Sequence, residues 1–394
     1  MITSVVFLEP LDVLFLRGNK LFGDPGSYGE SLVPPWPSVA AGALRSRMLV
    51  DAGIDPAAFA RAEVRHPALG TPEAPGCFAV TAFHLARRHA DGRVEALFQP
   101  PADLVIDEDT TGRPTVKALA PTALPAGVQS SAPLPRLAVL AERERGKPAS
   151  GYWLTEAGWQ RYLNGKRPEA KDLVKTSHLW SLDHRVGVGL ESTTRRAAEG
   201  RLFSVQAVAM RKREHRIEPV DAGYDVGFLA VVEGTGAPKA GSVRLGGDGR
   251  AAAVHAVEKT LPEPNYETLA QTRRCRLVLT TPGLFAAGWL PNGALPHDKR
   301  EDGAVRFALA GVAGWIVAAA VPRFEVVSGW DLAKRQPKPA QRAAPAGSVW
   351  WLELDEGVTA DGLRQLAAQG LWSEPCEEAS RRAEGFNRFT FAAY

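Results

Sequence analysis

The 394-residue sequence predicts an α+β protein built as two units, each a sheet with few helices. Most apolar segments are rich in β-branched and aromatic residues, whereas few have helical periodicity. The strand segments follow one another in runs instead of alternating with helices, which disfavours a doubly wound parallel sheet. A polar, proline-containing stretch, residues 260–271, reads as a linker. We therefore expect domains at 1–262 and 270–394, each large enough for its own core.

The N-terminal elements follow from local patterns. Residues 2–16 form an apolar, β-type run that stops at a glycine turn. Ser38 stands where a helix N-cap would, and apolar residues at helical spacing continue until Gly53. The segments 77–88 and 93–106 flank an Asp-Gly pair and predict a hairpin.

The rest of the chain predicts an insertion and more strands. Residues 107–150 are rich in Pro, Ala and Gly without a clear period, so we expect an insertion with loops, near 107–175 in all. Strand patterns return in the segments 185–190, 201–210, 224–234 and 241–257. The second unit is expected to begin with a strand from residue 273, to contain a helix at 360–368 and to close with an alternating strand at 385–394.

The amino-acid composition limits the classes of function that the protein can have. A net charge of +3, from 47 basic and 44 acidic residues, means that any nucleic-acid contact must be local. Cys77, Cys275 and Cys376 are far apart in sequence and predict ordinary reduced thiols. No apolar run reaches the roughly 20 residues of a bilayer span, and acidic residues follow the N-terminus where a signal peptide would be uncharged. We expect a cytoplasmic protein without a membrane partner.

Catalytic and cofactor motifs are missing from the sequence. The stretch GVGLES lacks the third glycine of a dinucleotide fingerprint, and no GxxxxGK[ST], HExxH, GxSxG or paired Cys/His spacing occurs. His184, beside Arg185, is the only histidine in a basic, glycine-rich setting. A lone histidine is more often structural than catalytic. The sequence predicts no enzyme activity, no cofactor and no metal.

Several stretches together resemble one known family. They are PLDVLFLRGNKLFG, PPWPSVAAGALRSR, HRVGVGLESTTRRAAEGRLFSV, GSVRLGGDGRAA, LTTPGLFAAGWLP, SGWDLAKRQPKPAQRAAPAGSVWW and GFNRF. In this order they resemble the third subunit of the Cmr complex, the RNA-guided effector of type III-B CRISPR systems, in the RAMP superfamily. The family usually has an RDGRPF-like turn where this chain reads RGNKLF, which keeps Arg17.

The resemblance implies a fold and a set of partners. It implies two ferredoxin-like (RRM-like) domains and a protruding, thumb-like β-hairpin near 185–206. It also implies binding of the 5′ handle of the CRISPR RNA, docking of the large polymerase/cyclase-type subunit and contact with the backbone subunit. The protein would contact target RNA as part of the complex. Members of the family are not known as nucleases of the complex.

The N-terminal helix is the first candidate RNA contact. Ser38, Gly42 and Arg45 fall on one helical stripe, and a helix N-terminus after a turn is a ready phosphate site. The alternative is a solvated arginine on an ordinary helix.

The hairpin and a later basic loop are the other candidates. A strand pair whose tip carries Arg195 and Arg196 suits wedging between nucleotides, although a solvated turn would tolerate the same residues. The basic segment 334–342 could track a phosphate backbone or be a charged linker. The predicted RNA-binding residues are Arg17, Ser38, Arg45, His184, Arg185, Arg195, Arg196, Lys338 and Arg342. Two other functions stay open: a RAMP-type repeat-RNA endonuclease using His184, and a purely structural docking protein.

Overall fold

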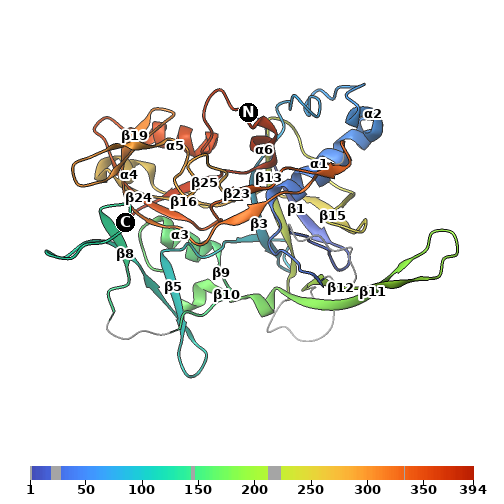
Figure 1. Ribbon diagram of the computed structural model, residues 1–394, viewed down its shortest axis with the longest axis horizontal. Coiled ribbons are helices and arrows are strands. Elements are labelled where there is room, and N and C mark those ends of the chain that lie inside the picture. Colours follow the sequence, from blue (N-terminus) through green and yellow to red (C-terminus); the bar gives the residue numbers. More distant parts are fainter. Residues whose placement is uncertain (1, 19–27, 143–146, 212–222, 332) are drawn as a thin grey trace. The chain divides into compact units, whose positions relative to one another are not determined.

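The computed structural model describes residues 2–18, 28–142, 147–211, 223–331 and 333–394. These residues form a mixed α and β structure with mostly antiparallel sheets and six α-helices (Figure 1). The chain divides into two compact units. Unit 1 contains residues 1–95, 177–259 and 326–341, and unit 2 contains residues 96–176, 260–325 and 342–394.

Four short elements span four of the five points where the chain passes from one unit to the other. They are β4 (Val94–Leu97), the 3-10 helix η2 (Thr176–His178), β20 (Glu325–Val327) and β23 (Gln341–Ala343). The chain also changes unit between Lys259 and Thr260, so it crosses between the units five times, and the units do not coincide with the ranges 1–262 and 270–394.

Unit 1 is organised around a six-stranded antiparallel sheet. Its described elements are β1 (Thr3–Pro10), β2 (Tyr28–Gly29), α1 (Pro37–Asp51), α2 (Pro56–Ala60), β3 (Ala79–Arg88), β11 (Trp180–Leu190), β12 (Ala197–Met210), β13 (Asp225–Glu233), β14 (Ser242–Arg244), β15 (Ala251–Ala256), β21 (Trp330–Asp331) and β22 (Gln336–Pro337). The sheet order is β14-β15-β1-β13-β3-β4. Strand β1 lies between β13 and β15 and is antiparallel to both. Its residues Phe7 and Leu8 are fully buried.

Unit 2 has a second six-stranded antiparallel sheet. Its elements are β5 (Leu104–Glu108), β6 (Pro114–Ala118), β7 (Ala120–Ala123), β8 (Arg136–Val139), β9 (Tyr152–Leu154), α3 (Glu156–Leu163), η1 (Ala170–Asp172), β10 (Leu173–Lys175), α4 (Tyr266–Thr272), β16 (Arg274–Leu279), β17 (Ala294–Lys299), β18 (Val305–Leu309), β19 (Val312–Ala320), β24 (Val349–Leu354), α5 (Ala360–Gln369), α6 (Ala379–Glu384) and β25 (Phe389–Ala392). The sheet order is β17-β18-β19-β24-β16-β25, and Trp350 and Phe391 are completely buried in its core.

The predicted insertion is folded and belongs to unit 2. It contains the β5–β6 and β7–β8 hairpins instead of loops alone. Buried polar contacts tie this region to the unit 2 sheet: the Arg276 guanidinium lies 2.7 Å from the carboxylate of Asp103, just before the insertion, and Tyr162 within the insertion donates to the same carboxylate at 2.8 Å. Residues 96–176 therefore pack as part of unit 2.

The N-terminal helix begins one residue before the predicted cap. Helix α1 has Pro37 at its first turn and Trp36 at the N-cap, so Ser38 is inside the helix and the prediction that it caps the helix is wrong. Proline is favoured at this position because its φ is preset and it has no N–H to satisfy. The expected linker also contains a helix, α4, where the Asn265 side chain accepts a hydrogen bond from the Thr268 N–H.

Candidate nucleic-acid interface

The β11–β12 hairpin is a long two-stranded ribbon whose register is continuous from Trp180↔Met210 to Val188↔Leu202. Two glycines let large side chains of β12 cross the ribbon. A Cβ atom on Gly187 would lie 2.4 Å from the Phe203 ring, and one on Gly189 would lie 3.0 Å from the Arg201 side chain. The glycines of GVGLES therefore make room for Phe203 and Arg201 and do not form a nucleotide loop.

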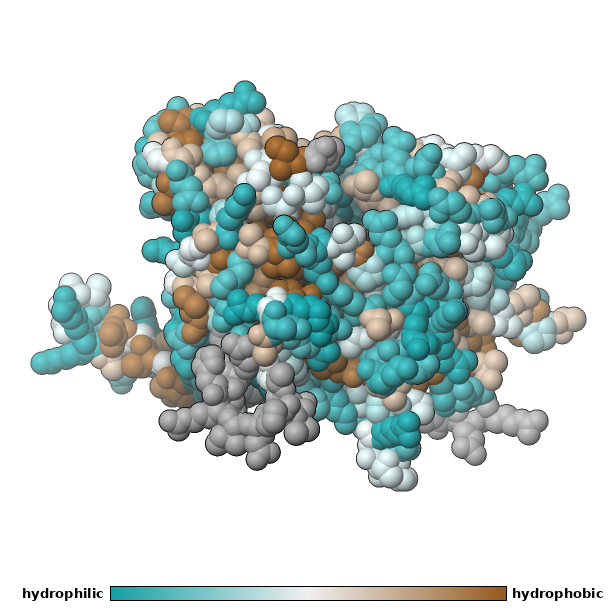
Figure 2. Space-filling view, turned by 180° about the vertical axis from the view of Figure 1, so that it is seen from behind, coloured by the Kyte–Doolittle hydropathy of each residue, from teal (hydrophilic) through white to brown (hydrophobic). Residues whose placement is uncertain are grey.

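The opposite face of the hairpin is aliphatic and exposed. Side chains alternate along a strand, so Val186, Val188 and Leu190 share this face with Leu202 of β12. Their exposed fractions are 69%, 44%, 59% and 60%. Figure 2 shows hydrophobic residues along the hairpin at the edge of the view and hydrophilic residues at its end. The distal part of the ribbon is thus not part of a hydrophobic core.

The hairpin tip is a closed turn with two outward arginines. The Glu191 N–H donates to the Arg196 carbonyl, and the Arg195 N–H donates to the Glu191 carbonyl, both at 2.9 Å. Arg195 adopts a left-handed φ of 55°, and the Thr194 hydroxyl donates to the Glu191 carboxylate at 2.8 Å. Both arginines are exposed, and within the described residues neither has an ion-pair partner. The tip therefore presents two unneutralised guanidinium groups on an ordered turn.

Two further predicted residues lie on β11. Arg185 forms an ion pair with Asp183, at 2.8 Å, so its charge is already compensated. His184 is exposed and lies opposite Gln206 across the ribbon. Gln206 in turn accepts a hydrogen bond from the Ser31 N–H at 3.1 Å, and Ser31 bridges to Arg17. The structure thereby brings Arg17 and His184 to the same end of the hairpin.

Arg17 lies against a glycine-rich turn that sequence reasoning did not include in the site. Its guanidinium is 3.5 Å from the Asp248 carboxylate. Burial lowers the pKa of Arg17, and the charge of Asp248 acts in the opposite direction. The turn approaches closely because the Gly247 N–H donates to the Phe15 carbonyl at 2.8 Å. The glycines of GGDG were the available signal for this contact.

Ser38 and Arg45 lie in different surroundings on helix α1. Ser38, in the first turn, is half-buried, and Gly42 is exposed with open space around it. The Arg45 guanidinium lies 5.1 Å from the centre of the Phe78 ring. A cation–π contact of this kind holds the side chain against the unit 1 surface.

The predicted basic loop is divided between the units. Lys338 follows β22 in unit 1, and its backbone N–H donates to the Gly329 carbonyl at 2.9 Å. Arg342 belongs to unit 2, where its guanidinium lies 4.9 Å from the centre of the Phe324 ring. The two residues therefore belong to separate local structures.

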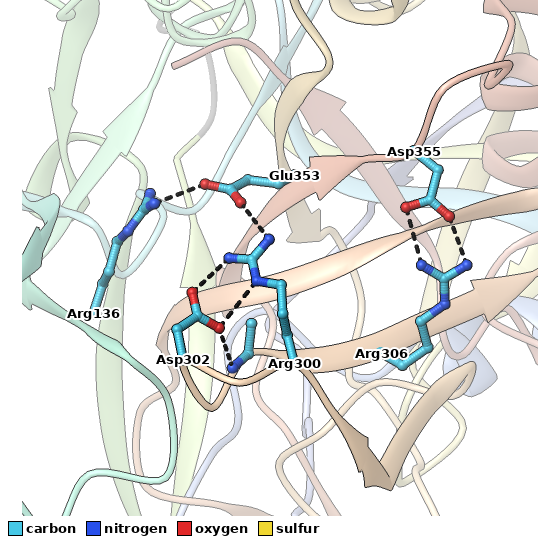
Figure 3. A network of polar contacts seen from close by, with 7 residues as sticks. Arg136, Arg300, Asp302, Arg306, Glu353 and Asp355 are labelled. Carbon is cyan, nitrogen blue, oxygen red and sulfur yellow. Dashed lines mark hydrogen bonds and ion pairs between the residues drawn. The ribbon is translucent and has the colours of Figure 1, made fainter.

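A group of arginines that sequence reasoning did not single out lies in unit 2 and is neutralised internally. Glu353 bridges Arg136 and Arg300 at 2.8 and 2.9 Å, and Figure 3 shows the whole network. The hydrogen bond from Arg300 lowers the pKa of Asp302. Three arginines face three carboxylates, listed as Arg136, Arg300 and Arg306 with Asp302, Glu353 and Asp355. This network has no charge left for a polyanion.

Comparison with known proteins identifies the family. The family model described as CRISPR-associated protein (Cas_Cmr3) matches residues 6–390. The chain belongs to this family. The predicted resemblance is thereby confirmed over nearly the whole sequence. No curated protein is significantly similar in sequence.

Two solved structures resemble this Cas_Cmr3 protein. A chain from the cryo-EM structure of the type III-B Cmr-beta complex bound to cognate target RNA and AMPPnP is 12% identical, with a TM-score of 0.48, over 96% of this chain and 93% of that chain. A chain from the same type of complex bound to cognate target RNA is 13% identical, with a TM-score of 0.43, over 88% of this chain and 86% of that chain.

Neither a metal site nor a membrane-spanning helix is found among the described residues of this Cas_Cmr3 protein. Among the described residues, no group of three or more His, Cys, Asp or Glu side chains could hold a metal ion. None of the helices in the described ranges has both the length and the apolar character needed to cross a bilayer.

Proposed function

We propose that this Cas_Cmr3 protein is a non-catalytic subunit of a type III-B CRISPR (Cmr) effector complex that binds the 5′ handle of the CRISPR RNA. In this role it docks the large polymerase/cyclase-type subunit, contacts the backbone subunit and meets target RNA through the complex. The observation that carries the RNA-binding role is the β11–β12 tip, where Arg195 and Arg196 are exposed without ion-pair partners in the described part of the chain. Family membership supports the complex.

The strand orders support two ferredoxin-like domains. In unit 1 the order β15-β1-β13-β3 places the fourth, first, third and second long strands side by side. Unit 2 repeats this order as β25-β16-β24-β19. The connecting helices occupy different places in the two sheets: α1 and α2 lie between the first and second strands, β1 and β3, whereas α5 and α6 lie between the third and fourth strands, β24 and β25. A sheet of this type in RRM proteins serves as an RNA-binding platform.

The hairpin suits a thumb that separates nucleotides. Its aliphatic face can pack on unstacked bases, while the tip arginines can hold the flanking phosphates. In contrast, Arg185 is already paired with Asp183 and is expected to contribute less. We expect the tip to lie where the handle passes into the guide.

The test is a double substitution of the tip in the full chain. Arg195→Ala with Arg196→Ala should weaken binding of a handle-containing guide RNA and reduce the log–log salt slope by about 1.4, since one single-strand phosphate contact contributes about 0.7. The matched control is Arg61→Ala with Arg93→Ala, which removes the same charge from exposed arginines that have carboxylate partners. If both pairs of substitutions weakened RNA binding equally, the tip arginines would contribute only general positive charge.

A footprint of the assembled complex tests the position of the tip. The tip variant should assemble normally and expose new nuclease cleavage at the handle–guide junction. An unchanged footprint would make the tip a solvated turn. Labelled repeat RNA incubated with the chain alone should stay intact, and His184-dependent cleavage would instead favour an endonuclease.

A further inference from the structure

Trp330 differs from every other tryptophan of the protein. All ten tryptophans lie in the described part of the chain, and Trp330 alone is exposed, with 55% of its surface accessible. Trp289, in contrast, packs against the unit 2 core. Among the described residues no ring or cation covers the Trp330 indole. Tryptophan is enriched at binding surfaces because its ring offers a large apolar face together with a polar N–H group.

The backbone around Trp330 is ordered by hydrogen bonds. Strand β21 pairs with β22 so that Trp330 lies opposite Pro337, which is also exposed. The Asp331 carboxylate accepts from the N–H groups of Ala333 and Lys334 at 2.9 and 3.1 Å. The Ser328 hydroxyl donates to the Lys338 carbonyl at 2.9 Å. The indole is therefore presented from a fixed hairpin, which reduces the entropy lost when a ligand binds.

Two basic residues, Lys334 and Arg335, follow Trp330 in sequence and lie between β21 and β22 of the same small hairpin. Lys334 and Arg335 are exposed and, within the described ranges, have no ion-pair partner. The carboxylate of Asp331 is occupied by backbone donors. An aromatic platform beside uncompensated cations is the combination used to bind single-stranded nucleic acid, because bases stack on the ring and phosphates meet the cations.

We propose that Trp330 is a stacking platform for a base of single-stranded RNA and that Lys334 and Arg335 contact the adjacent phosphates. This site rests on the proposed RNA-binding function and adds a second contact, separate from the tip arginines. A protein partner would also favour an exposed tryptophan and an arginine, but protein interfaces are depleted in lysine, such as Lys334.

The test uses two ten-nucleotide strands, oligouridylate RNA and the corresponding strand with abasic sugars. Trp330→Ala in the full chain should weaken oligouridylate binding by roughly 5- to 150-fold, the effect of losing one base–aromatic stack, and should change abasic binding less than about twofold. Trp330→Phe, which keeps an aromatic face, should retain most of the affinity. Lys334→Ala with Arg335→Ala should weaken binding of both strands.

The outcomes separate this inference from the proposed function. Equal losses on both strands, or unchanged oligouridylate affinity with normal melting, would overturn the stacking role. Loss of complex assembly with unchanged RNA affinity would assign Trp330 to a protein interface instead. If the tip variant leaves the handle footprint unaltered while Trp330→Ala shows the base-dependent loss, the thumb fails and the stacking site stands.

Discussion

The buried Asp103–Arg276 pair gives a quantitative prediction about how the insertion is held in unit 2. The Asp103 side chain is completely buried and Arg276 is 7% exposed. Arg276 also donates to the Tyr162 carbonyl at 3.0 Å, and its guanidinium lies 4.0 Å from the centre of the Tyr162 ring. Removing Asp103 would leave the buried Tyr162 phenol without its acceptor and the buried Arg276 guanidinium without its carboxylate partner, although the Tyr162 and Ala393 carbonyls still accept from Arg276. Breaking such a pair from one side costs about 3–5 kcal/mol.

We therefore expect Asp103→Ala to lower the free energy of unfolding by about 4 kcal/mol, which corresponds to a fall of roughly 10 °C in the melting midpoint of a unit of this size. The measurement is denaturant unfolding followed by tryptophan fluorescence, with separate transitions fitted for the two units. The double variant Asp103→Ala, Arg276→Met removes both charges and should recover part of the loss, because the uncompensated charge is gone. A loss of stability below about 1 kcal/mol in Asp103→Ala would refute this reasoning. It would also be refuted if the losses of Asp103→Ala and Arg276→Met simply added up in the double variant.

Two further predictions concern unit 1. Burial lowers the pKa of His84 to about 4, so the unfolded chain binds more protons than the folded chain between about pH 6.5 and 4. The stability that neutral His84 contributes should be complete above this window and should fall by up to about 3 kcal/mol as the pH decreases through it. His84→Leu should remove that part of the pH dependence in urea titrations. Gly234→Ala should destabilise the protein by about 3 kcal/mol or more, because φ is +84° and the new Cβ would lie 1.8 Å from the Cys77 carbonyl oxygen, whereas the control Gly236→Ala, with open space around it, should stay within about 1 kcal/mol in the same denaturation assay.

Local sequence patterns were sufficient to predict the helices and strands that have a strong apolar periodicity. The predicted helix 360–368 is α5, Ala360–Gln369, and the predicted N-terminal strand contains β1, Thr3–Pro10. Helix α4 was missed because it has only seven residues next to prolines; its Asn265 cap was the local signal. The Pro37 start of α1 was missed because Ser38 is also a good capping residue.

Long-range contacts were beyond sequence reasoning. Val6 pairs with Ala230 and Ala256, and Asp103 reaches Arg276, but nothing near these residues in sequence specifies the partner. The same limit applies to the site. Arg185 and Arg195 look alike in a basic segment, yet only the folded chain gives Arg185 a carboxylate partner.

The distribution of paired and unpaired charge indicates how a nearly neutral protein can bind RNA locally. In unit 2 the three arginines of Figure 3 each face carboxylates, so their field cancels within a few ångströms. At the β11–β12 tip and on the β21–β22 hairpin, arginine or lysine side chains are exposed without such partners among the described residues. Phosphates can release counterions only where protein charge is not already compensated. The two hairpins of unit 1 are therefore two places where uncompensated positive charge can act locally, one with an aliphatic face and the other with an exposed indole on the same hairpin as its cations.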